Sequence, residues 1–171
     1  MKQSIIAITE GDEPDCNTLV RARLMLAQAH GGGAALELPL HITLFRWTRK
    51  GSADVLLPET TPGLRVRLGV PQIAVGGSAL LCPVHMSRPL LALQRDAGAS
   101  ASASGTLEWQ EAVSPLHVTL AYRDYSVASI SAMYETLQGL GLVREYLVDV
   151  KHLALCESDA MGIWRVISGA Q

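Results

Sequence analysis

The sequence predicts an α+β fold built as two strand-helix-strand lobes. Predicted strands and helices alternate in the same order in both halves of the chain, and each half contains a six-residue sequence that differs from the other copy at one position. A length of 171 residues with 49% apolar side chains suits one compact domain that buries its own core. We therefore expect residues 1–171 to form a single domain of two pseudo-symmetric lobes.

The first lobe is expected to begin with a strand at Gln3–Thr9, where the pattern of apolar residues suits a strand. A proline and several acidic residues favour the start of a helix at Asp15–Ala29, and three consecutive glycines end it. The β-branched and aromatic residues that follow a second proline predict a strand at Leu38–Trp47. These three elements form a strand-helix-strand unit.

The middle of the chain combines a loop with a predicted hairpin. The polar segment Thr48–Gly63 is broken by glycine and prolines, so we expect a loop with at most one helical turn near Ala53–Leu57. Two strands are expected to follow, at Leu64–Val75 and Ser78–His85. Gly76-Gly77 between them is a typical two-residue hairpin turn.

The second lobe continues with a helix that starts near Ser87, which caps it, and ends near Gly98. Small and polar residues at 97–105 predict a connector without a core of its own. The remaining expected elements are a strand, a helix and two further strands: Ser114–Arg123, Val127–Leu140, Glu145–Cys156 and Ile163–Ile167.

The charge balance excludes long-range attraction of a polyanion, because 14 basic residues face 16 acidic ones and the net charge is −2. If the partner is a nucleic acid, the attraction must be local. The longest apolar runs, such as Val55–Pro58 and Ala79–Val84, are too short to cross a membrane. The apolar stretch Ile5–Ile8 is too short for the core of a signal peptide. We therefore expect a cytoplasmic protein, monomeric and without a membrane partner.

No cofactor or metal is expected from the sequence. Cys16, Cys82 and Cys156 are widely spaced, without a Cys-x-x-Cys pair or a nearby pair of histidines, so we expect three reduced thiols. The carboxylate or histidine clusters typical of magnesium and zinc sites are absent as well.

An internal repeat carries the functional prediction. Pro-Leu-His-Ile-Thr-Leu at residues 39–44 recurs as Pro-Leu-His-Val-Thr-Leu at residues 115–120, which is 76 residues later. The strand and the helix that precede each copy are related by almost the same offset. His85-Met86-Ser87, a third sequence of the form His-x-Ser or His-x-Thr, lacks the rest of the hexapeptide and is attributed to chance.

Each repeat is predicted to present an imidazole beside a hydroxyl. Residues two apart on a strand share a face, so His41 projects with Thr43, and His117 with Thr119. If the lobes pack about a pseudo-twofold axis, the two pairs face each other across a cleft. One neutral histidine could then take a proton from an attacking oxygen while the other, protonated, gives one to the leaving oxygen. The hydroxyls would bind the phosphate oxygens, so the set suits displacement at phosphorus.

The two-residue period of a strand also predicts which face each neighbouring side chain occupies. It places Phe45 and Trp47 on the His41 face and turns Arg46 away from it. It also places Ala121 and Arg123 on the His117 face and turns Tyr122 away. Arg123 is thus the expected cation for a phosphate, against the alternative of a surface ion pair with Asp124.

Aromatic and basic side chains near the first repeat supply further candidates. Phe45 could stack on a base at the cleft rim, with core packing as the alternative, and Trp47 and Trp109 are weaker candidates for the same role. The cluster Arg46, Arg49 and Lys50 could contact RNA or form an ordinary exposed loop.

The doubled His-x-Thr strands, HITL at residues 41–44 and HVTL at residues 117–120, resemble the two-histidine (2H) phosphoesterase superfamily. Within it, the chain is similar to the bacterial RNA 2',3'-cyclic phosphodiesterase and 2'-5' RNA ligase group over nearly its whole length. The doubled motif is specific, whereas the other matching elements are only consistent with the group.

The resemblance implies a bilobal, duplicated α+β fold with antiparallel sheets lining a central cleft and helices outside. It implies metal-independent opening of 2',3'-cyclic phosphates, of RNA ends or nucleotides, to 2'-phosphates. His41 and His117 would be the catalytic acid and base, with His117 as the base, and Thr43 and Thr119 would bind the phosphate. The polar segment at 48–63 and the connector at 99–105 depart from the pattern of relatives and leave the substrate undetermined.

Several alternatives stay open at this point. The same four residues could carry out 2'-5' RNA ligation, or hydrolyse 2'-5' or cyclic oligonucleotide signals. A non-catalytic nucleotide-binding module is a further alternative, although the intact histidines and threonines of both repeats argue against it.

Overall fold

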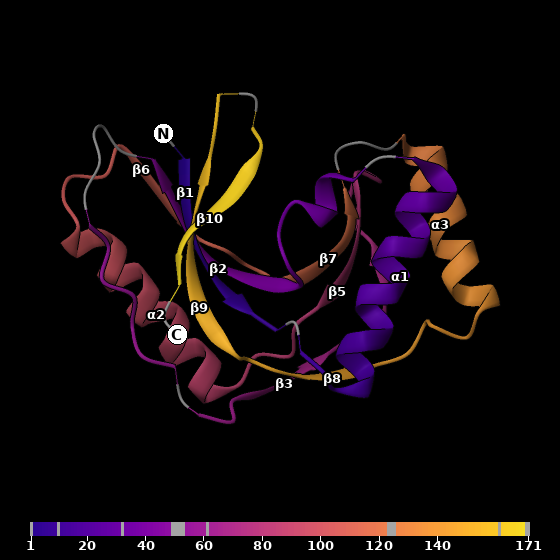
Figure 1. The fold of residues 1–171 in the computed structure, drawn as a ribbon, viewed down its shortest axis with the longest axis horizontal. Coiled ribbons are helices and arrows are strands. Elements are labelled where there is room, and N and C mark those ends of the chain that lie inside the picture. The colour runs from indigo at the N-terminus through magenta and orange to yellow at the C-terminus, as the bar shows by residue number, and fades with distance from the viewer. Residues whose placement is uncertain are drawn as a thin grey trace.

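The structure, a computed structural model, describes residues 2–9, 11–31, 33–48, 54–60, 62–122, 126–160 and 162–169. An antiparallel sheet carries most of the fold, with strand order β10-β9-β1-β2-β7-β5-β4 and with β6 also paired to β2 (Figure 1). Its strands are β1 (Lys2–Ile8), β2 (His41–Thr48), β4 (Gln72–Ile73), β5 (Ala79–Pro83), β6 (Trp109–Ala112), β7 (His117–Tyr122), β9 (His152–Ser158) and β10 (Trp164–Gly169).

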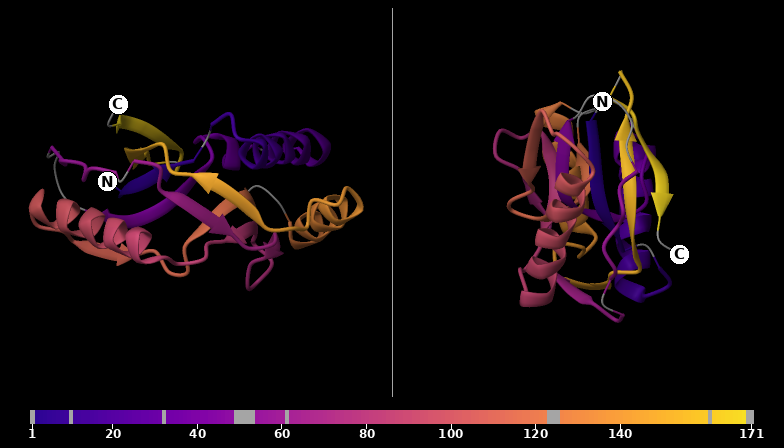
Figure 2. Two further views of the ribbon diagram at one scale, coloured as in Figure 1. Left: turned by 90° about the horizontal axis from the view of Figure 1, so that it is seen from below. Right: turned by 90° about the vertical axis from the view of Figure 1, so that its left-hand side faces the viewer.

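A two-stranded antiparallel sheet, β3 (Arg65–Leu68) with β8 (Tyr146–Asp149), completes the β structure of the described residues. The helices are α1 (Pro14–His30), α2 (Arg88–Ala103) and α3 (Val127–Gly139), with a short 3-10 turn at Ala34–Leu36. Helix α2 lies at one end of the molecule, and α1 and α3 lie at the other (Figures 1 and 2). The α+β class predicted from the sequence and the antiparallel sheets implied by the resemblance are confirmed.

The two halves meet where the repeated strands pair. In the β2–β7 pair, Ile42 lies opposite Val118, and these are equivalent residues of the two hexapeptides. A pair of equivalent residues facing each other in an antiparallel register is what a local twofold axis produces. The repeated sequence therefore forms the centre of the sheet.

The predicted strand-helix-strand units are present, but their helices are exchanged between the halves. Helix α1 follows β1 in the chain and packs against β7 and β8, whereas α2 follows β5 and packs against β2 and β6. At the second contact, an added Cβ on Gly98 of α2 would lie 3.0 Å from the Phe45 ring, so the helix and the strand approach closely. Each repeat thus contributes the helix that supports the other repeat's histidine strand.

Both histidine strands contain a β-bulge at the same position of the repeat. In the β1–β2 pair, Ile5 faces Phe45 and Ile6 faces Thr43, so Leu44 is the additional residue. The β5–β7 pair skips Leu120 in the same way. A bulge shifts the alternation of side chains by one residue, so beyond each Leu the side chains exchange faces.

Several elements differ from the sequence-based expectation. The small-residue segment after Gly98 is helical to Ala103, because alanine is the best helix former and Ala97 and Ala101, four residues apart, are both buried. The expected strand at 64–75 divides into β3 and β4 on either side of Gly69 and Pro71. The expected strand at 145–156 likewise divides into β8 and β9, and β6 was not predicted.

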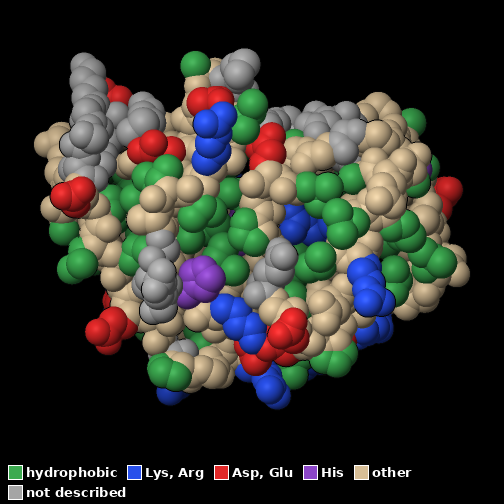
Figure 3. Space-filling model, in the orientation of Figure 1, with side chains coloured by type: hydrophobic (Ala, Val, Ile, Leu, Met, Phe, Trp, Pro, Cys, Tyr) green, Lys and Arg blue, Asp and Glu red, His purple; other side chains and the backbone are tan. Residues whose placement is uncertain are grey.

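The loop expectation for Thr48–Gly63 is tested only in part. Residues 54–60 have no regular structure, Thr48 ends β2, and residues 49–53 and 61 lie outside the described residues. Among the described residues no helix combines the length and hydropathy needed to cross a membrane. On the face seen in Figure 3, acidic and basic side chains are interspersed, without one large field of either sign.

A buried glutamine supports the first bulge, which gives a stability prediction. The side-chain amide of Gln94 on α2 donates to the carbonyl of Leu44 at 3.2 Å and to that of Val113 at 2.7 Å. Gln94→Leu leaves the Val113 carbonyl without this donor, and we expect a loss of about 1–3 kcal/mol in the free energy of unfolding. Urea unfolding with an unchanged m-value is the measurement. A loss no larger than that of Gln110→Leu, an exposed position on β6, would contradict it.

Candidate active site

The two repeated histidines are held in the same way. Nδ1 of His41 lies 2.7 Å from the carbonyl oxygen of Pro39, and Nδ1 of His117 lies 3.0 Å from that of Pro115. A carbonyl oxygen only accepts, so each Nδ1 carries the hydrogen and donates it. Nε2 of each ring is therefore the nitrogen that can exchange a proton with a ligand.

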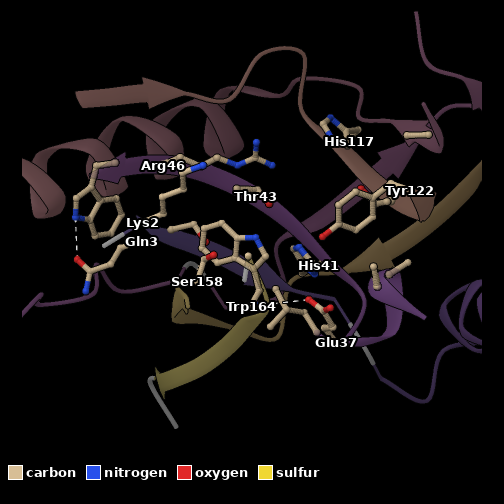
Figure 4. A pocket seen from close by; sticks show the side chains of 18 of the residues that line it. Lys2, Gln3, Glu37, His41, Thr43, Arg46, His117, Tyr122, Ser158 and Trp164 are labelled. Carbon is tan, nitrogen blue, oxygen red and sulfur yellow. Dashed lines mark hydrogen bonds between the residues drawn. The ribbon is translucent and has the colours of Figure 1, made fainter. Parts of the chain in front are cut away.

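The predicted imidazole and hydroxyl pairs lie together in one cleft. His41, Thr43, His117 and Thr119 all line a cavity of about 520 Å³, within the range of small-molecule sites. Because Ile42 lies opposite Val118, the antiparallel register brings His41 to the side of Thr119 and Thr43 to the side of His117. Figure 4 shows His41, Thr43 and His117 in their surroundings, with the two histidines on adjacent strands. The cleft thus has two imidazoles beside two hydroxyls.

The environments of the two histidines are not equivalent. Burial lowers the pKa of His41 to about 4, and the positive charges of Arg23, Arg46 and His117 act in the same direction. The hydrogen bond to Pro39 opposes this shift but does not cancel it. At neutral pH His41 is therefore uncharged, with a free electron pair on Nε2 that can accept a proton.

The bulges bring Arg46 and Tyr122 into the cleft. The strict alternation assumed for the sequence turned both side chains away, and this expectation is wrong, because Leu44 and Leu120 each add one residue to the strand. Arg46 and Tyr122 are 76 residues apart and thus equivalent positions of the repeat. The two halves of the cleft therefore match in their histidines and threonines. They differ at the position of Arg46 and Tyr122, where one half supplies a cation and the other a phenol.

Arg46 is placed as a cation for an anionic ligand. It lines the cavity, and among the residues that the structure describes no carboxylate forms an ion pair with it. Its guanidinium extends from β2 past Thr43 on the side of His117 (Figure 4). Guanidinium groups bind phosphate oxygens with two parallel hydrogen bonds, so this position suits a phosphate at the threonines.

Phe45, predicted to lie at the cleft rim, is 8% exposed and packs in the core against α2. The bulge at Leu44 turns it to the helix-covered side of the sheet, so the expectation that it shares the His41 face is wrong. Trp47 packs beside Phe45, with ring centroids 6.1 Å apart, and is fully buried. Its indole N–H donates to Gln3 at 3.0 Å, and both residues also line the cavity. Arg123, the other predicted cation, lies outside the described residues, as do Arg49 and Lys50.

Residues from distant strands complete the cleft. Trp164 of β10 and Lys2 of β1 line the cavity, and both were missed because only the sheet order brings them to the cleft. The backbone N–H of Trp164 donates to the carboxylate of Glu37 at 3.1 Å, which ties β10 to the segment that precedes β2. Trp109, a weak sequence candidate, lines the same cavity from β6 and is 49% exposed.

Comparison with known proteins supports the fold. The structure is similar to that of TT0787 of Thermus thermophilus, with a TM-score of 0.54, over 99% of this chain and 96% of that one, at 14% sequence identity. At this identity the likeness concerns the fold alone. No family model matches the sequence, and no curated protein matches it.

Proposed function

We propose that this chain is a phosphodiesterase that opens 2',3'-cyclic phosphates, at RNA ends or in nucleotides, to 2'-phosphates. The observation that carries the proposal is the pair of histidines on equivalent strands, each holding Nδ1 on a backbone carbonyl and leaving Nε2 to exchange protons in one cleft. The resemblance of the doubled motif to the 2H phosphoesterases supports the same chemistry.

The proposed step is an in-line displacement by water. The water oxygen forms a bond to phosphorus while its proton passes to Nε2 of His41. The bond between phosphorus and O3' breaks, and O3' takes a proton from Nε2 of His117, so the phosphate remains on O2'. The lowered pKa of His41 supports its role as base, which reverses the assignment expected from the resemblance.

The remaining groups stabilise the phosphate. The hydroxyls of Thr43 and Thr119 donate to its non-bridging oxygens, and Arg46 balances the negative charge that develops on them. The charge on the reacting group is thus matched by side chains of this chain.

A direct test is hydrolysis of nucleoside 2',3'-cyclic phosphates in excess chelator. We expect turnover to be the same with and without EDTA, because Arg46 and the hydroxyls bind the phosphate. Separation of nucleoside 2'- and 3'-phosphates identifies the bond that is cleaved, and the 2'-phosphate is expected. Loss of turnover in EDTA, or a 3'-phosphate product, would contradict the mechanism. No turnover of any cyclic phosphate would favour a nucleotide-binding module, and joined RNA ends would favour ligation.

A further inference from the structure

A row of five side chains crosses the cleft floor beyond Arg46. Successive cross-strand pairs link Trp164 with Ser158, Ser158 with Lys2, Lys2 with Thr48, and Thr48 with Trp109. Residues directly opposite in antiparallel pairs share a face, so all five lie on one side of the sheet. All five line the cavity that contains the histidines. The cavity therefore extends from the catalytic strands to this row.

The row lies beyond the group that reacts. From Thr43, which is placed to bind the phosphate, β2 continues for five residues to Thr48, a distance of roughly 15 Å at the rise of a β-strand. Trp164 packs on the cleft floor formed by Ile6, Ile8 and Leu38, and its indole extends toward His41 (Figure 4). Trp164 is thus placed beside the terminal nucleoside. Trp109 lies on β6, on the other side of β2.

Trp109 and Lys2 have the properties of a nucleotide subsite. Trp109 leaves 49% of its surface exposed at the cavity wall, and exposed indoles offer a stacking surface that accepts any base. Lys2 is exposed, and among the described residues no carboxylate pairs with it. A cation beside an aromatic surface is the usual combination for binding single-stranded nucleic acid.

We infer that the cleft has a second nucleotide subsite, in which Trp109 stacks on a base and Lys2 binds the phosphodiester that joins it to the reacting nucleotide. The inference rests on the proposed function. An RNA end that carries a 2',3'-cyclic phosphate continues only on its 5' side, so the subsite takes the preceding nucleotide. The substrate is therefore an oligonucleotide end of at least two nucleotides.

The test compares a dinucleotide that ends in a 2',3'-cyclic phosphate with the corresponding nucleoside 2',3'-cyclic phosphate. We expect kcat/KM for the dinucleotide to be about tenfold higher or more, from the usual contribution of one stacked base. Trp109→Ala removes this advantage and leaves the mononucleotide unchanged, whereas Trp109→Phe keeps most of it. In Lys2→Ala, the plot of log kcat/KM for the dinucleotide against log salt concentration should have a slope shallower by about 0.7. Arg165→Ala, on the other face of β10, is the control for loss of one positive charge.

The proposal of a second subsite would be overturned if kcat/KM were equal for the two substrates. It would also be overturned if Trp109→Ala lowered kcat/KM equally for both. A second measurement separates this outcome from failure of the proposed function. Calorimetric binding of the dinucleotide and the mononucleotide, each already opened to the 2'-phosphate, reports the subsite without turnover. Tighter binding of the dinucleotide that depends on Trp109 supports the subsite even if neither cyclic substrate is hydrolysed, and equal binding rejects it.

Discussion

Replacing either cleft histidine with alanine is expected to lower kcat on 2',3'-cyclic phosphates by about 10²–10⁴-fold, the usual contribution of general acid–base catalysis. The losses in His41→Ala and His117→Ala should be far from additive in the double variant, because the base and the acid act in the same step. Steady-state rates of the three variants measure this.

The pH profiles distinguish the two roles. With His41 as base, kcat/KM rises with pH as its imidazole loses a proton, with a pKa of about 4 in the free protein. It falls at higher pH as the general acid loses its proton. We therefore expect His41→Ala to lose the rising limb and His117→Ala to lose the falling one. The exchanged result would restore the assignment that the resemblance implies.

His85→Ala is the matched control. His85 belongs to the third His-x-Ser or His-x-Thr sequence of the chain, and it is exposed, 3.5 Å from the Glu145 carboxylate. Its replacement should leave kcat and both limbs unchanged. A comparable loss in this variant would mean that the repeat does not mark the catalytic residues.

The repeated histidines and threonines are the part of the candidate site that could be predicted from the sequence. A hexapeptide with Pro, His and Thr in fixed order determines the Nδ1 contact, because the accepting carbonyl belongs to the residue two positions before each histidine. It also determines that each histidine and threonine share a face. These features depend only on residues within two positions of each histidine along the chain.

The rest depends on backbone and tertiary structure that no local pattern encodes. The faces of Arg46, Phe45 and Tyr122 were assigned wrongly because a bulge at a leucine has no distinctive residue in either strand. Trp164 and Lys2 enter the cleft only through the order of strands in the sheet. The exchange of α1 and α2 between the halves is likewise a property of the packing. The repeated hexapeptide thus predicts the candidate reacting groups but not the groups that surround them.

Arg46→Ala is expected to lower kcat by roughly 10²–10³-fold, the usual effect of removing one group that stabilises a developing oxyanion. The kcat of Arg46→Lys should lie between those of the unmodified protein and Arg46→Ala, because lysine keeps the charge but not the paired hydrogen bonds of a guanidinium. Steady-state rates on a 2',3'-cyclic nucleotide measure both. Arg165→Ala, on the opposite face of β10, is the control for loss of a positive charge.

The same variant has a second, independent readout in the pH profile. Arg46 is one of the positive charges that lower the pKa of His41, so its removal raises that pKa and moves the rising limb to higher pH. The shift is partial, because burial, the largest cause, remains. Arg123→Ala, which removes the cation predicted from the sequence, provides the comparison. A larger loss of kcat in Arg123→Ala, with an unmoved limb in Arg46→Ala, would assign the phosphate to Arg123. A larger loss of kcat in Arg46→Ala, with a shifted rising limb, would place the phosphate between Arg46 and the two threonines. The bulge at Leu44 turns Arg46 toward that part of the cleft.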